Sequence, residues 1–389
     1  MSEVVIVGIG QLPVGEHWDI SLRQMAVRAA RQAMEQSAGL VPQAIYIGNM
    51  LASTLSHQAN LGSLIADELA MRGTEGVTIE AAGASGGAAL RQAYLAILSG
   101  FVDVALVIGV EKYTDQVGPS VEAAVSQMLE SDYEAMQGMT PTSQAGLIMQ
   151  RYLHEYQVDR EVFAAFPLLA HTNGVDNPNA MYRKVIKPEA YQRAEMISDP
   201  LNLFDMAPYA DGAAALLLAR AALVPESFTH PLVRITGSSV VIDTLALHDR
   251  PDPLAFHAAE YSVARACRQA GILPADVDLF ELADAFSVYA AISLEAAGFA
   301  SRGQGWKLAK NGDLARTGQM PIATLGGLKA RGNPIGATGV YQVIEAVLQL
   351  RGEAGSGQVA GARRAMVQSL GGPASTAVTH VLERWDGER

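Results

Sequence analysis

Four segments of this chain, two of which contain glycine-rich turns, carry most of the information about its chemistry. They are 77–90, 104–115, 205–215 and 326–342. The turn at 81–87 places Ser85 directly before an apolar helical stretch, and a helix N-terminus of this kind favours thiolates and other anions. The single cysteine, Cys267, lies outside these turns and excludes an intramolecular disulfide or a cysteine-cluster metal site. The eight histidines show no metal-ligand spacing, so we expect no metal.

The elements that position these turns alternate between short β-branched strands and longer alanine-rich helices, which predicts an α/β layered fold. The spacing predicts helices over 21–37, 61–71, 88–98, 257–270, 288–298 and 337–350. It predicts strands over 44–50, 77–80, 102–110, 212–219, 233–243, 365–369 and 376–383, with further strands at the N-terminus and leading into Leu282. The glycine turn and helix at 85–90 have a counterpart at 336–341, which suggests two duplicated halves, and 115–200 reads as a mostly helical insertion.

Composition bounds the class of protein. The chain has 389 residues, of which 49% are hydrophobic and 17% charged, so it is long and apolar enough to bury a large core. The longest apolar stretch falls short of the roughly 18 residues that span a bilayer, and no signal peptide is visible. A net charge of −12 disfavours nucleic acid and anionic lipid as partners. We therefore expect a cytoplasmic protein that acts on small molecules, without nucleic-acid or membrane contacts.

The four segments together resemble the thiolase superfamily, in the branch of sterol-carrier-type and archaeal-type acetoacetyl-CoA thiolases. They read VTIEAAGASGGAAL, VALVIGVEKYTD, DMAPYADGAAA and GGLKARGNPIGATGVYQ, and the resemblance covers essentially the whole chain. It implies two βαβαβαββ halves in an α-β-α-β-α arrangement with an inserted loop domain, and a dimer or tetramer. The domains expected are 1–114 with 205–225 for the N-terminal half, 115–204 for the loop domain and 226–389 for the C-terminal half.

The chain departs from the family where the family does its chemistry. Gly83 stands where the resemblance implies the nucleophilic cysteine, and Ala283 and Asn333 stand where it implies two histidines. The fourth catalytic region, around Ser369, has no cysteine either. Glycine offers no nucleophile, and alanine and asparagine are not bases near neutral pH. Thiolase turnover through a covalent acyl-enzyme is therefore expected to be absent.

Several polar side chains in or near these motifs have both a chemical and a structural interpretation. Asn333 retains an amide that can donate to a thioester oxygen, although a purely structural role in the turn is equally open. Ser85 has no histidine in the four segments to activate it, so we interpret it as the cap of a helix starting at Gly86. Asp284 could act as a base if buried, but a structural role is favoured for it and for Glu281. Other candidates are the phenols of Tyr289 and Tyr341, which are more often core.

Binding of coenzyme A is implied by the resemblance and by the glycine turns, because only glycine lets the backbone approach a pantetheine arm closely. His171 matches a histidine of the family's loop domain and is expected to organise that domain. Basic residues of the insertion are expected near the phosphorylated end of the ligand: Arg183, Lys184, Lys187 and Arg193. The predicted substrate-binding set is Ser85, His171, Arg183, Lys184, Gly326, Gly327, Gly336, Gly339, Gly371 and Gly372.

The sequence therefore predicts an acetyl-CoA acetyltransferase-like protein that binds CoA or acyl-CoA without Claisen turnover and holds no permanent cofactor. Two alternatives stay open: a cysteine-independent retro-aldol enzyme acting on acyl-CoA, and a non-catalytic subunit of an acyl-CoA complex. Relatives of this branch imply a small OB-fold zinc protein as a partner.

Overall fold

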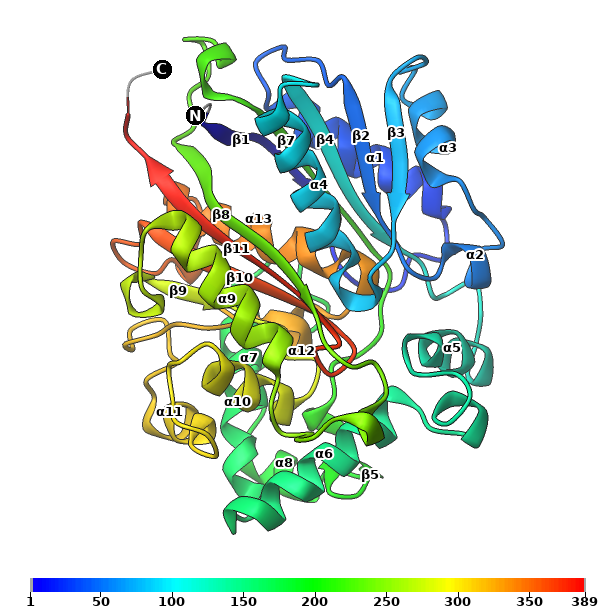
Figure 1. Ribbon diagram of the computed structural model, residues 1–389, viewed down its shortest axis with the longest axis vertical. Coiled ribbons are helices and arrows are strands. Elements are labelled where there is room, and N and C mark those ends of the chain that lie inside the picture. Colours follow the sequence, from blue (N-terminus) through cyan, green and yellow to red (C-terminus); the bar gives the residue numbers. More distant parts are fainter. Residues whose placement is uncertain (1–2, 388–389) are drawn as a thin grey trace.

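The computed structural model describes residues 3–387 and is built around one nine-stranded sheet in the order β3-β2-β4-β7-β1-β8-β11-β10-β9 (Figure 1). Its strands are β1 (Val4–Gln11), β2 (Ala44–Gly48), β3 (Glu75–Ile79), β4 (Val104–Glu111), β7 (Gly212–Arg220), β8 (Leu232–Ile242), β9 (Leu279–Glu281), β10 (Arg364–Gly371) and β11 (Thr376–Trp385). A separate two-stranded ribbon pairs β5 (Met196–Ser198) with β6 (Leu201–Asn202).

The helices are α1 (Leu22–Glu35), α2 (Ala52–Leu55), α3 (Leu61–Glu68), α4 (Ser85–Ser99), α5 (Pro119–Val125), α6 (Pro141–Tyr156), α7 (Ala165–Gly174), α8 (Pro188–Arg193), α9 (His257–Ala270), α10 (Ser287–Ala296), α11 (Gly305–Asn311), α12 (Gly327–Arg331) and α13 (Thr338–Arg351). The first of them begins where Ser21 and Gln24 form a reciprocal capping box, and its apolar residues recur at helical spacing on the buried face. No helix within residues 3–387 is both long and apolar enough to cross a membrane.

The internal duplication is visible in the strand order. The first half runs β3-β2-β4-β7-β1, and the second runs β9-β10-β11-β8, with Ile322 adding a single parallel bridge outside β9. The two halves therefore share one strand order. In the second half, the outermost strand, which corresponds to β3, is reduced to the single bridge at Ile322. They join through β1 and β8, which pair antiparallel at Val5 with Arg234 and at Ile6 with Val233.

Helices separate and cover the two halves in layers. Helix α1 packs on β1 and β7, and α9 packs on β8 and β11. Helices α4 and α13 contact each other and lie between the halves, where residues of both share one apolar core with β4 and β10. This confirms the predicted layered α/β architecture with strands between helices.

The insertion lies between β4 and β7 and is mostly helical, as the sequence predicted. It contains α5, α6, α7 and α8 with the short β5–β6 ribbon. Figure 1 places α6, α8 and β5 together at the lower end of the molecule, with α5 to one side below α2. Tyr152 and Phe163 of the insertion share an apolar core with Phe280, Tyr289 and other residues of the second half. The insertion is therefore packed against the C-terminal half, while the proposed domain boundaries stay predictions.

Candidate active-site pocket

Three of the four predicted catalytic positions meet in one small cavity. Gly83, Ala283 and Asn333 line a pocket of about 50 Å³, to which the insertion contributes Met128 and the start of α6. Its other lining residues are Pro141, Gln144, Met206, Ala207, Tyr209, Ala285, Phe286, Tyr289, Leu328, Ile335, Thr338, Leu370 and Gly372. Ser369 is buried behind this pocket, where its Oγ donates to Gln342 Oε1 over 3.1 Å.

Gly83 sits in a tight 3₁₀ turn, Ala82–Ala84, between β3 and α4. A Cβ at position 83 would lie 2.5 Å from the carbonyl oxygen of Leu370, a backbone atom at the end of β10. Any side chain there would have to displace the backbone, because such a contact is well below the van der Waals distance. The structure thus fills the expected nucleophile position with a neighbouring carbonyl group.

Ser85 does not cap α4, which corrects the sequence prediction. The helix begins at Ser85 itself, and its N-cap residue, Ala84, makes no side-chain capping bond. The buried Ser85 hydroxyl instead accepts from Ala81 N at 2.9 Å and donates to Ala82 O at 2.6 Å. It therefore holds the turn that carries Gly83, and its predicted contact with substrate stays a prediction.

Asn333 presents a donor at the pocket. Thr338 Oγ1 donates to Asn333 Oδ1 over 3.0 Å, and Asn333 N donates to Pro208 O over 2.9 Å. The side-chain oxygen is thereby occupied by the Thr338 hydroxyl, and no hydrogen bond from Nδ2 is found among residues 3–387. The amide hydrogens are available to an oxygen in the pocket, as the sequence reasoning required.

Two phenols line the same pocket. Tyr289 was a sequence candidate. Tyr209 lies in the quoted segment 205–215 but was not singled out, because only the folded chain brings it beside Asn333. Tyr209 stacks on Tyr113 with ring centroids 5.6 Å apart, and burial raises the pKa of both Tyr209 and Tyr289. Tyr341 does not line the pocket, since its buried hydroxyl lies 2.8 Å from Leu12 O and 2.9 Å from Ala213 O.

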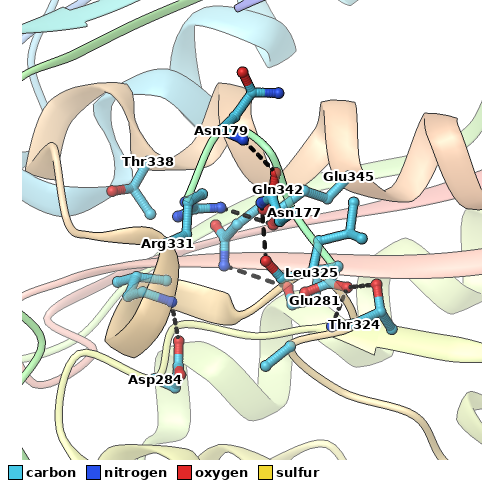
Figure 2. A network of polar contacts seen from close by, with 12 residues as sticks. Asn177, Asn179, Glu281, Asp284, Thr324, Leu325, Arg331, Thr338, Gln342 and Glu345 are labelled. Atoms are coloured by element: carbon cyan, nitrogen blue, oxygen red, sulfur yellow. Dashed lines mark hydrogen bonds and ion pairs between the residues drawn. The ribbon is translucent and has the colours of Figure 1, made fainter. Parts of the chain in front are cut away.

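The carboxylates of Asp284 and Glu281 each accept a hydrogen bond from a backbone amide. Asp284 accepts from Leu328 N at 2.7 Å, and Glu281 accepts from Thr324 N at 2.9 Å (Figure 2). Burial raises the pKa of both groups. Neither side chain lines the pocket, so both serve to fix the segment that runs from Thr324 into α12.

Beside them lies a buried ion pair, also drawn in Figure 2. Arg331 Nη1 contacts Glu345 Oε2 at 2.7 Å, and both side chains are almost fully buried. Lys329, on the same helix as Arg331, donates to Asp205 O at 2.6 Å, and burial lowers its pKa to about 8. These contacts hold α12 in place between the pocket and the insertion.

A second, wider cavity of about 610 Å³ adjoins the first, and Met206 lines both. Its walls include His171, Arg183 and Lys184 as predicted, together with Lys329. The His171 ring stacks on Tyr182 and its Nδ1 lies 3.3 Å from Lys184 O, while burial lowers its pKa. His171 therefore organises the wall of this cavity. Lys187 and Arg193 do not line it.

Most of the predicted substrate-binding glycines pack protein against protein. A Cβ at Gly339 would lie 2.4 Å from Gly87 N, and one at Gly336 would lie 2.6 Å from Glu111 Oε2. Gly326, Gly327 and Gly371 are similarly crowded by Gly174, Asp284 and Ala81, and of the six predicted glycines only Gly372 lines the pocket. The sequence analysis missed this packing role, and a substrate contact by the other five stays a prediction.

The lone cysteine stands apart from both cavities. Cys267 is buried in α9, and burial raises the pKa of its thiol to about 11. A buried thiol with a raised pKa is mostly protonated near neutral pH, which disfavours a role as a nucleophile. Within residues 3–387 no group of three or more histidine, cysteine, aspartate or glutamate side chains is placed to hold a metal ion.

Known proteins match the chain over its whole length. Residues 4–222 match the thiolase N-terminal domain and residues 239–384 the thiolase C-terminal domain-like family. An acetyl-CoA acetyltransferase of Methanothermobacter thermautotrophicus is 38% identical over 99% of this chain and 100% of its own length. Bovine sterol carrier protein 2 is 30% identical over 76% of this chain and 56% of its own. The solved Ltp2-ChsH2(DUF35) aldolase superposes with a TM-score of 0.85 and 22% identity, covering 100% of this chain and 99% of that one.

Proposed function

The chain belongs to the thiolase family, and on that premise we propose that it binds coenzyme A thioesters without forming a covalent acyl-enzyme. One observation carries the proposal. The pocket that unites Gly83, Ala283 and Asn333 contains, among the described residues, no cysteine, histidine or carboxylate side chain. A Claisen condensation or thiolysis needs a nucleophile and a base at such a site.

The architecture around the pocket supports binding. The wider cavity with its basic wall at Arg183, Lys184 and Lys329 suits an anionic, phosphorylated ligand. Met206 links it to the smaller pocket, where the Asn333 amide can donate to the thioester oxygen. In this arrangement the coenzyme occupies the wider cavity and the acyl group the smaller one.

Covalent chemistry is tested by intact-protein mass spectrometry after incubation with acetyl-CoA and with acetoacetyl-CoA. The proposal predicts no acyl adduct and no thiolysis of acetoacetyl-CoA by free coenzyme A. A protein that becomes acetylated at a discrete site within the pocket would overturn it.

A second candidate function is retro-aldol cleavage of a β-hydroxyacyl-CoA, favoured by the two phenols at the pocket. In that reaction a base removes the hydroxyl proton, the Cα–Cβ bond breaks to give a carbonyl product, and an acid protonates the resulting thioester enolate. Their raised pKa keeps Tyr209 and Tyr289 protonated, so they suit the acid role, and Asn333 suits the enolate oxygen. No described lining residue is an evident base, which ranks this function second. Tyr209→Phe and Tyr289→Phe should each slow such cleavage, and unchanged rates in both would remove it.

We also propose that the working unit is a dimer or tetramer in the cytoplasm, and that a small OB-fold zinc protein associates with it. Strand β3 supports self-association because it forms an exposed edge of the sheet, with Val77 45% exposed. Light scattering coupled to gel filtration tests the oligomer, and a monomer at micromolar concentration would contradict it.

A further inference from the structure

Gln144 places an unusual polar atom at the candidate pocket. It lies in the first turn of α6, lines the cavity with Met128 and Pro141, and is 1% exposed. Its side-chain Oε1 is buried and has no hydrogen-bond partner among residues 3–387. Buried amide oxygens in folded proteins nearly always have a partner, so this one requires an explanation.

Glu134 orients the side-chain amide of Gln144. Gln144 Nε2 donates to Glu134 Oε2 over 3.3 Å. Glu134 is itself buried and also accepts from Leu247 N at 2.6 Å and from Glu130 N at 3.1 Å. A carboxylate with these donors around it takes the amide nitrogen and not the amide oxygen. The oxygen of Gln144 is therefore turned away from Glu134.

A ligand group that satisfies this oxygen must carry a hydrogen-bond donor. The neighbouring wall is largely apolar, with Met128, Pro141 and Phe286. A plain acyl chain would cover Oε1 without satisfying it, and a ketone would bring a second acceptor against it. A hydroxyl group is the smallest common acyl substituent that can donate.

We propose that Gln144 is a specificity-determining residue that selects short acyl groups carrying a hydroxyl over the corresponding unsubstituted and keto acyl groups. This inference rests on the proposed binding of CoA thioesters in the same pocket, and the small cavity volume restricts it to short chains. Glu134 acts as a positioning residue, since it fixes the direction of the Gln144 amide.

The test is a calorimetric titration with three ligands of equal chain length: butyryl-CoA, 3-hydroxybutyryl-CoA as separate enantiomers, and acetoacetyl-CoA. One hydrogen bond to a buried, otherwise unsatisfied carbonyl corresponds to about a tenfold change in affinity. We expect one hydroxybutyryl enantiomer to bind about tenfold more tightly than butyryl-CoA, and acetoacetyl-CoA to bind no more tightly than butyryl-CoA.

A near-isosteric variant separates this contact from general pocket shape. Gln144→Met should remove the preference for the hydroxyl while leaving butyryl-CoA affinity within about threefold. Gln137→Met makes the same substitution at an exposed position of the insertion and should keep the wild-type preference. Melting curves of both variants establish that they fold, and if Gln144→Met does not, the three-ligand series on the wild-type protein decides.

The outcomes are distinguishable. Equal affinity of the wild type for butyryl-CoA and both hydroxybutyryl enantiomers would overturn the role of Gln144 alone, and would indicate that a buried water satisfies its oxygen. Preference retained in Gln144→Met would do the same. If no CoA thioester binds at all, the proposed function fails and this inference fails with it.

Discussion

Substitution of Gly83 by alanine tests whether the expected nucleophile position is closed. The added Cβ would lie 2.5 Å from the Leu370 carbonyl oxygen, where an ordinary contact begins at 3.4 Å, so the backbone must move by about 0.9 Å. Overpacking of this kind costs about 1–3 kcal/mol, and the loss of glycine's freedom in the unfolded chain offsets about 0.4–1 kcal/mol of it. We expect a net loss of about 1–2 kcal/mol in the free energy of unfolding.

The assay is urea unfolding followed by circular dichroism, with Gly15→Ala as the matched control. A Cβ at Gly15 meets no atom within 4 Å, so that variant should be neutral or slightly more stable than the wild type. Gly83→Cys should be destabilised like Gly83→Ala, and adding Ala283→His and Asn333→His should not restore thiolysis while Leu370 keeps its position. If Gly83→Ala proves as stable as Gly15→Ala, the reasoning about a closed position is refuted.

Three further predictions follow from the site and its supports. Asn333→Ala should weaken acetyl-CoA binding about tenfold in a calorimetric titration, and an unchanged dissociation constant would remove Asn333 from the site. Arg331→Met should lower the free energy of unfolding by about 3 kcal/mol because it strands the buried Glu345 carboxyl, whereas pairing it with Glu345→Leu should recover most of that loss in the same urea assay. Burial raises the pKa of Glu111 from 4.5 to about 7, so the folded state binds the extra proton between those values. The wild type should therefore lose stability from pH 4.5 to 7 relative to Glu111→Gln, and parallel pH profiles of the two would contradict this.

Periodicity predicted most of the elements because their apolar faces are local features of the sequence. Helix α9 was predicted over the same residues that it occupies, 257–270, and β4 and β7 followed from continuous apolar runs. Helix α4 begins at Ser85, three residues before its predicted start. The sequence pattern did not predict the first turn, because it contains Gly86 and Gly87 and glycine is a poor helix former. In the structure these glycines allow close contact with α13.

The candidate site was only partly predictable. The resemblance to the thiolase motifs pointed to Gly83, Ala283 and Asn333, and the fold brings them into one pocket. Tyr209 and Gln144 were missed because no local pattern marks a residue that faces a pocket through long-range packing. The closing of position 83 by Leu370 O was likewise invisible, since it depends on the distance between two segments far apart in the chain.

Calorimetric titration of the purified protein with acetyl-CoA tests the central claim most directly. We expect acetyl-CoA to bind saturably, with micromolar affinity or better, at no more than one site per chain. No detectable heat with acetyl-CoA, and none with a longer acyl-CoA that shares its coenzyme portion, would contradict it and would favour a subunit whose pocket is unused.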